Sequence, residues 1–180
     1  LRSAGLAACA RRAAGVGGLG VGELKSEADG GTQRFFIDGG FLQIKGSVVT
    51  VLTHEALQRW LERIRHAPLT AIDTETDSLD GMTARIVGIS LATAPGEAAY
   101  IPLRHGYAGA PDQLPFDAVL AALKPWLEDE GAKKVGQNIK YDTHVFANAG
   151  IAMRGYAHDT LLESYVYEVH QKHNLESLAQ

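Results

Sequence analysis

The clearest periodic pattern in the chain begins at Thr53. In the stretch THEALQRWLERIRHA (residues 53–67), apolar positions recur three, one and three residues apart, at Leu57, Trp60, Leu61 and Ile64. This spacing places them on one face of a helix, for which Thr53 is a good N-cap and Pro68 a stop. The pattern therefore predicts an amphipathic helix that packs against a core.

The stretches that follow are apolar and rich in β-branched residues. Residues 69–73, 85–94 and 98–103 are predicted strands, with a Pro95-Gly96 turn between the last two. Residues 115–130 then have helical periodicity, and Pro125 is expected to kink or shorten that helix. Three strands joined by short turns predict an antiparallel meander.

The last third of the chain is predicted to be mostly helical. The expected elements are a strand at 133–138 and helices at 139–150, at 158–169 and, starting only, at 173–180. Gly150 is a typical helix end, Thr160 and Glu163 have capping-box spacing, and Asp159 is expected to serve as a cap. This order of elements predicts a mixed α/β fold, in which the antiparallel meander comes first and helices flank the sheet.

The first 47 residues differ in character from the rest. They form an uncertain, partly flexible segment rich in Ala and Gly, and residues 34–52 read as short strands with turns. Residues 48–180 have the composition and periodicity of one folded domain. The chain is thus divided at residue 47 into a segment without an assigned role and a domain.

Composition excludes several classes of function. The net charge of −4 disfavours a protein that coats nucleic acid by neutralising phosphates, although it leaves room for an enzyme that handles nucleic acid through bound metal ions. The single cysteine, Cys9, excludes an internal disulfide and a cysteine-based zinc site. No apolar run is long enough to span a membrane, and a reducing, cytosolic setting is expected.

Four acidic residues crowd the end of the first strand of the meander. Asp73 and Glu75 are two positions apart, so they project from the same face of a strand. Such a pair can hold Mg²⁺ or Mn²⁺, whereas a solvated acidic strand end is an equally simple interpretation. An EF-hand loop is disfavoured, because the positions that require Gly and Glu hold Ser78 and Ala84.

A second group of polar residues lies in VGQNIKYDTH (residues 135–144). Asp142 is expected one turn into a helix, and Gln137 and Asn138 at the turn that precedes it. Amides at such a turn can meet an anionic ligand. They can equally serve as ordinary turn and cap residues, and this stretch alone leaves both interpretations open.

Together the two motifs resemble a known family. IDTETDSLD (residues 72–80), followed about sixty residues later by VGQNIKYD (residues 135–142), is similar to the first two exonuclease motifs of the 3′–5′ proofreading domain of bacterial DNA polymerase I. The resemblance continues through EAAYIPLRH, APDQLPFD, LKPWLEDE and HDTLLESYV, and covers residues 48–180. It implies a ribonuclease-H-like fold of the DEDD exonuclease type.

The resemblance also implies roles for individual residues. Asp73 would bridge two divalent ions (Mg²⁺ or Mn²⁺), Glu75 would hold the ion that carries the attacking water, and Asp142 would support the second ion. Other positions would line the cleft for a single-stranded DNA 3′ end, namely Thr76, Leu79, Gln137, Asn138 and Tyr141. Leu79 would wedge against the terminal base.

One expected motif is missing from the sequence. The family pattern requires a third motif, Tyr-x-x-x-Asp, and the nearest candidate, YVYEV, ends in Val169. We therefore expect a fragment that is weakly active or inactive alone, from a parent chain that also carries a polymerase domain and acts in the bacterial cytoplasm at the nucleoid. Two alternatives remain: a non-catalytic nucleic-acid-binding or spacer module, and an RNase-D-like exoribonuclease.

Overall fold

The computed structural model describes residues 22–28, 31–37, 47–108, 110, 112–170 and 172–173. The strands are β1 (Gly22–Ala28), β2 (Gly31–Ile37), β3 (Ser47–Thr50), β4 (Thr70–Thr76), β5 (Ile86–Ala94), β6 (Glu97–Pro102), β7 (Lys134–Gly136) and β8 (Tyr156–Asp159). The helices are α2 (His54–His66), α3 (Phe116–Leu127), α4 (Ile139–Asn148) and α5 (Thr160–Tyr167).

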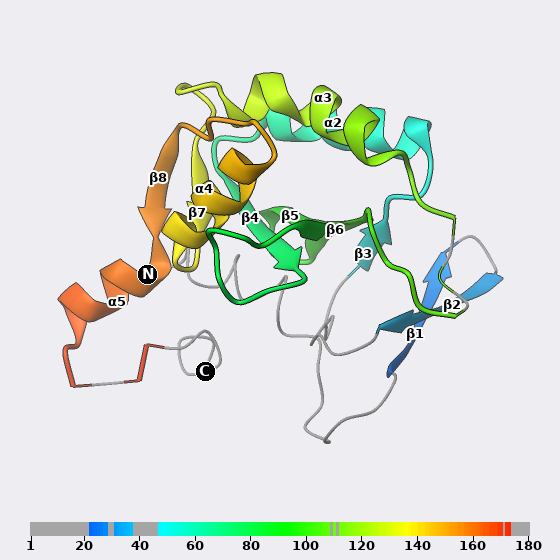
Figure 1. Cartoon of the computed structure of the whole chain (residues 1–180), viewed down its shortest axis with the longest axis horizontal. Helices are drawn as coiled ribbons and strands as arrows, with labels where there is room; N and C mark the ends of the chain where they lie inside the picture. Colours follow the sequence, from blue (N-terminus) through cyan, green and yellow to red (C-terminus); the bar gives the residue numbers. More distant parts are fainter. Residues whose placement is uncertain are drawn as a thin grey trace.

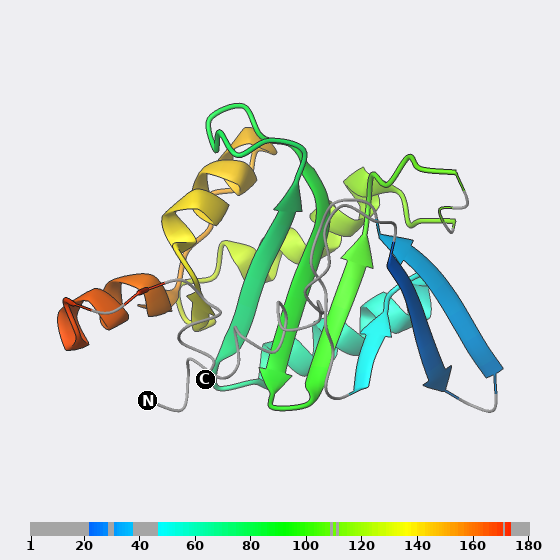
Figure 2. The same cartoon turned by 90° about the horizontal axis from the view of Figure 1, so that it is seen from below.

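Six of the strands form one mixed sheet in the order β3-β6-β5-β4-β7-β8. Figure 2 shows β3, β6, β5 and β4 side by side. β4, β5 and β6 are antiparallel neighbours, as the predicted meander requires. β3 is parallel to β6, β7 to β4, and β8 to β7. The predicted mixed α/β fold with the meander first is confirmed. β1 and β2 pair antiparallel in a separate two-stranded sheet.

Helices α2, α3 and α4 build the main core together with one face of the sheet. α2 and α3 lie side by side along that face (Figures 1 and 2). The residues predicted to point inward from α2 are buried there, against apolar side chains of the meander such as Ile72, Ile89 and Ile101. The opposite face carries a small cluster of buried residues, namely Ala71, Ala92, Ala98 and Val135. Because side chains alternate along a strand, Asp73 and Glu75 project from this second face.

Local structure departs from the sequence prediction at a few points. The predicted capping box is wrong, because Asp159, not Thr160, is the N-cap of α5 and accepts hydrogen bonds from the N–H groups of Leu161 and Leu162. Glu163 instead lies 2.6 Å from His158 Nδ1. The strands β1 and β8 were not indicated by the pattern. α3 ends two residues after Pro125, so that helix is indeed shortened. The helix predicted at 173–180 lies, after its first residue, outside the described residues.

Candidate active site

β4 carries the first pair of acidic residues to its C-terminal end. Asp73 is 8% exposed, and Glu75 is partly buried on the same face of the sheet. The pairing of β4 with β5 shifts register between Glu75 and Thr76. Such irregularities re-aim side chains and end regular pairing, and they are frequent beside active sites. The regular pairing of β4 with β5 therefore ends next to the two carboxylates.

α4 brings Asp142 to the same strand. Its carboxylate is 1% exposed, and Oδ1 accepts a hydrogen bond of 3.0 Å from the Thr74 N–H and one of 2.7 Å from the Thr74 hydroxyl. β7 pairs with β4 only at Thr70 and Ala71. Further along the same strand, the N–H of Thr74 is bonded by Asp142 instead of by a neighbouring strand. Residues 68 positions apart in the sequence thus meet. The structure places Asp142 against the residue that lies between Asp73 and Glu75.

The three carboxylates have the chemistry of a hard-cation site. Carboxylate oxygens suit Mg²⁺ and Mn²⁺, which agrees with the predicted cofactors. In the part of the chain that the structure describes, however, no three His, Cys, Asp or Glu side chains converge as a group that could hold a metal ion. The donor types fit, and the metal site itself stays a prediction.

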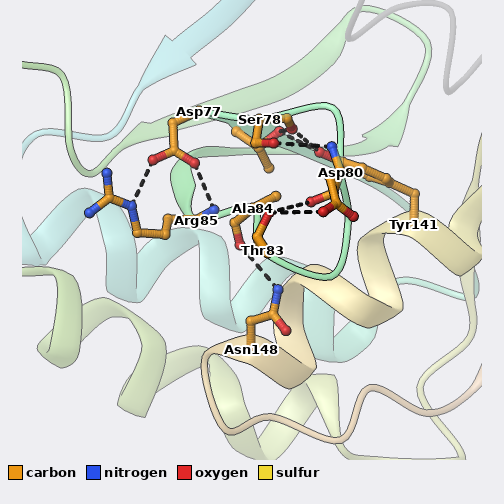
Figure 3. Close-up of polar contacts among 9 residues, drawn as sticks. Asp77, Ser78, Asp80, Thr83, Ala84, Arg85, Tyr141 and Asn148 are labelled. Carbon is orange, nitrogen blue, oxygen red and sulfur yellow. Dashed lines mark hydrogen bonds and ion pairs between the residues drawn. The ribbon is translucent and has the colours of Figure 1, made fainter.

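A loop of residues 77–85 follows β4 directly and is closed at its base. The Asp77 N–H donates to the Arg85 carbonyl at 3.2 Å, and the Asp77 carboxylate accepts from the N–H and from Nε of Arg85 at 2.9 and 2.7 Å (Figure 3). These hydrogen bonds from Arg85, together with its charge, hold the pKa of Asp77 below its usual value. Leu79, the predicted wedge, is 98% exposed in this loop.

Thr76 and Tyr141, both predicted to line the cleft, meet where β4 enters the loop. The Thr76 hydroxyl and the Tyr141 hydroxyl are 2.6 Å apart. Each also contacts the Ser78 carbonyl, at 2.9 Å and 2.5 Å respectively. Tyr141 is on α4, one residue before Asp142, so the same helix fixes both the buried acid and the start of the loop.

Gln137 and Asn138 lie at the turn between β7 and α4, as predicted. Gln137 Nε2 donates to the His173 carbonyl at 2.9 Å, and the Thr160 hydroxyl donates to Gln137 Oε1. Asn138 has a left-handed backbone, with φ 58° and ψ 49°, a conformation in which Asn is enriched among non-glycine residues. Both residues are thus placed beside the start of α4, and the Gln137 amide already has protein partners.

An acid that the motifs did not point to completes the start of α4. Asp159 Oδ1 accepts from the Asn138 N–H and Oδ2 from the Ile139 N–H, each at 3.0 Å. The same carboxylate caps α5. The exposed amides of a helix N-terminus attract anions, and here they meet a side chain of the protein itself. A residue 21 positions after Asn138 gives no spacing signal for this role.

Tyr100 on β6 was also not found from the sequence. Its hydroxyl lies 2.6 Å from His105 Nε2, and its ring covers Gly88, where an added Cβ would be 2.1 Å from the hydroxyl oxygen. Burial raises the pKa of Tyr100 far above its usual value, and the negative charge of Glu75 raises it further. A neutral phenol therefore lies within electrostatic reach of one of the two strand acids.

A family model described as 3′–5′ exonuclease matches residues 48–180. The chain belongs to this 3′–5′ exonuclease family. Among its curated relatives, DNA polymerase I of Pseudomonas aeruginosa is 52% identical over 132 residues, which are 72% of this chain and 14% of that protein. The chain thus spans about a seventh of the length of this relative.

The chain is also similar to one solved structure in its fold and, over a short segment, to one further protein in its sequence. The crystal structure of Trypanosoma brucei RNase D matches with a TM-score of 0.55 at 16% identity, over 68% of this chain and 41% of that one, which supports the shared fold. A further 46-residue match, 46% identical, is to the ATP synthase epsilon chain of Rhodopirellula baltica and covers 26% of this chain and 36% of that protein.

The helices of the exonuclease fold are short. Within the described residues, none combines the length and apolar character needed to cross a bilayer.

Proposed function

We propose that residues 48–180 are part of the proofreading exonuclease domain of a bacterial DNA polymerase I, which hydrolyses the 3′-terminal phosphodiester of single-stranded DNA. The observation that carries this proposal is the pair of hydrogen bonds from Thr74 to Asp142, since it joins the two acidic motifs at one strand end. Family membership supports the type of reaction. The DNA polymerase I relatives support the proposed DNA substrate and bacterial setting, and the nucleoid-associated location is part of the proposal.

The proposed roles use the residues that the sequence motifs indicated. Asp73, Glu75 and Asp142 would hold two divalent ions, Mg²⁺ or Mn²⁺. Bound ions of this kind supply an activated water and charge stabilisation for hydrolysis of a phosphodiester, which releases a nucleoside monophosphate. The three carboxylates come from β4 and α4, which are joined by the hydrogen bonds between Thr74 and Asp142.

Other residues of the site orient the DNA end. Thr76 and Tyr141 hold the Ser78 carbonyl and thereby the start of the loop that carries Leu79. Leu79 packs against the terminal base, a contact that tolerates any sequence because every base has an apolar face. Gln137 and Asn138 line the path of the strand beside α4. Together these groups hold a flexible single-stranded end in one orientation.

The proposal includes a fourth acid and a Tyr that these 180 residues do not contain. No Tyr in the sequence is followed by Asp four positions later. Members of such a site act as a unit, so the loss of one ligand is expected to reduce activity severely. We therefore propose that residues 1–180 alone are weakly active or inactive, and that the missing residues and a polymerase domain belong to the same parent chain.

The test compares two nucleic acids of the same sequence. The product of the full reading frame is incubated with 5′-labelled single-stranded DNA or RNA, with Mg²⁺ or with EDTA, beside an Asp142→Asn variant. We expect stepwise shortening of the DNA from its 3′ end, which is abolished by EDTA and in the variant. Faster shortening of RNA would instead favour an RNase-D-like nuclease, the alternative whose fold the Trypanosoma brucei RNase D structure shares. Binding of DNA without hydrolysis would favour a non-catalytic module.

A further inference from the structure

The C-terminal end of α4 is hydrogen-bonded to the loop of residues 77–85. Asn148, the last residue of α4, donates through Nδ2 to the carbonyl of Gly81 at 2.9 Å. It also donates to the carbonyl of Ala84 at 3.2 Å (Figure 3). An amide nitrogen carries two protons, so both are used in these two bonds. The loop is therefore fixed to α4 on its far side by Asn148 and on its near side by Tyr141, which bonds to the Ser78 carbonyl.

Inside the loop, polar groups satisfy one another. Asp80 accepts from the Met82 N–H at 3.0 Å and from the Thr83 hydroxyl at 3.1 Å, and its carbonyl accepts from the Thr83 and Ala84 N–H groups. Gly81 lies so close to the Tyr141 ring that an added Cβ would be 3.1 Å from it. A loop bonded in this way has little freedom to lose when a ligand binds.

The large apolar side chains of this loop face solvent. Leu79 is 98% exposed and Met82 is 67% exposed. They are three residues apart, and the loop starts two residues after Glu75. An internally bonded loop with apolar side chains at its surface is the arrangement of a preformed binding surface, because its shape is already held by hydrogen bonds and its apolar side chains are accessible to a partner.

We propose that Asn148 is a positioning residue, whose amide holds the 77–85 loop so that Leu79 and Met82 form a rigid apolar edge for the 3′-terminal base of DNA. This inference rests on the proposed exonuclease function and assigns to Met82 a contact beside that of Leu79. Asn148 acts only through the loop, since its side chain is bonded to the Gly81 and Ala84 carbonyls. Its loss lets the apolar edge move relative to the acids on β4.

The test measures binding of the terminal base apart from hydrolysis. A single-stranded oligonucleotide with 2-aminopurine at its 3′ end is titrated in EDTA with the product of the full reading frame. The variant Asn148→Asp keeps the size of the side chain but removes both donors and faces two carbonyl oxygens with a carboxylate. We expect affinity for the terminal base to fall about tenfold, which corresponds to about 1.4 kcal/mol. Asn148→Ser, which keeps one donor, should fall between wild type and Asn148→Asp.

Two comparisons separate positioning from a general structural role. Ala147→Asp adds the same charge at a neighbouring exposed position of α4, and it should leave 2-aminopurine binding unchanged. A double-mutant cycle with Leu79→Ala should be non-additive, because a displaced loop cannot use Leu79 in any case. If the fold-loss of affinity in the double variant equals the product of the fold-losses in Asn148→Asp and Leu79→Ala, the two residues act independently and the proposal is overturned. The proposal is also overturned if Asn148→Asp binds the 2-aminopurine oligonucleotide as tightly as wild type. This holds even if the variant has a lower Tm, because Asn148 would then only stabilise the fold.

Failure of the proposed function itself gives a different result. If wild type does not shorten DNA in Mg²⁺ while the Asn148 variants still lose 2-aminopurine binding as expected, the hydrolytic function is wrong and the positioning role stands. If wild type shortens DNA and the KM for a single-stranded end is unchanged in Asn148→Asp, the positioning role is wrong and the exonuclease function stands.

Discussion

The buried contact between Asp142 and Thr74 allows stability and activity to be separated. Asp142→Ala removes the acceptor of two hydrogen bonds at a site where Thr74 is 5% exposed and Asp142 is 1% exposed. Each buried donor left without a partner costs about 1–3 kcal/mol. The Thr74 hydroxyl can rotate toward another acceptor, whereas its N–H cannot. We therefore expect Asp142→Ala to lower the free energy of unfolding by about 2–4 kcal/mol.

Asp142→Asn is the matched variant. An amide oxygen at the position of Oδ1 still accepts both hydrogen bonds, and the variant buries no charge. Its free energy of unfolding should therefore stay within about 1 kcal/mol of wild type. Hydrolysis of DNA should be lost in both variants, because an amide is a much poorer ligand for Mg²⁺ than a carboxylate.

Urea unfolding followed by the fluorescence of the buried Trp60 and Trp126 measures the stability difference. With a slope of about 2 kcal/mol per molar urea, Asp142→Ala should lower the midpoint by about 1–2 M and Asp142→Asn by about 0.5 M or less. The reasoning is refuted if Asp142→Ala unfolds at the wild-type midpoint, since the Thr74 contact would then contribute nothing. Full nuclease activity in Asp142→Asn would refute the metal-ligand role.

Three further predictions concern residues outside the acidic motifs. Burial lowers the pKa of Lys134 to about 8 from 10.5, so between these pH values the folded chain binds fewer protons than the unfolded chain. Stability should therefore rise by up to about 3 kcal/mol across this window, and urea midpoints of Lys134→Met at pH 7 to 10 should lack that rise. Asp159→Ala removes the cap of two helices and should lower the free energy of unfolding by about 2–4 kcal/mol, with a smaller loss in Asp159→Asn; equal losses would contradict the capping role. Gly88→Ala should cost about 1–3 kcal/mol because Tyr100 must move, and much less in a Tyr100→Ala background; the same cost in both backgrounds would show that the ring is not the obstacle.

Local patterns in the sequence predicted the elements well where one face of the element is buried. The helical spacing of Leu57, Trp60, Leu61 and Ile64 predicts α2 because all four side chains enter the core. Likewise, the two-residue spacing of Asp73 and Glu75 is enough to place them on one face, because alternation along a strand is a local property.

Long-range partners could not be predicted in the same way. The bonds from Asp159 to the start of α4 and from Asn148 to the loop of residues 77–85 depend on how distant segments pack, and neither leaves a periodic signal. The capping-box prediction failed for a related reason. The hydroxyl of Thr160 donates to the Gly136 carbonyl and to Gln137 Oε1 at the end of β7, and Asp159 caps α5 instead. Parallel pairing of β3 with β6 is equally invisible to local patterns.

The carboxylate of Asp159 has a consequence for the order in which the protein can mature on the ribosome. α4 carries Tyr141 and Asp142, yet the first amides of α4 receive their partner only from a residue synthesised 20 or 21 positions later. Until Asp159 has emerged, a nascent α4 lacks its N-terminal cap and can fray at the turn that precedes Asp142. We therefore expect the second acidic motif to become fixed against β4 only after α5 begins to emerge, late in the synthesis of residues 48–180.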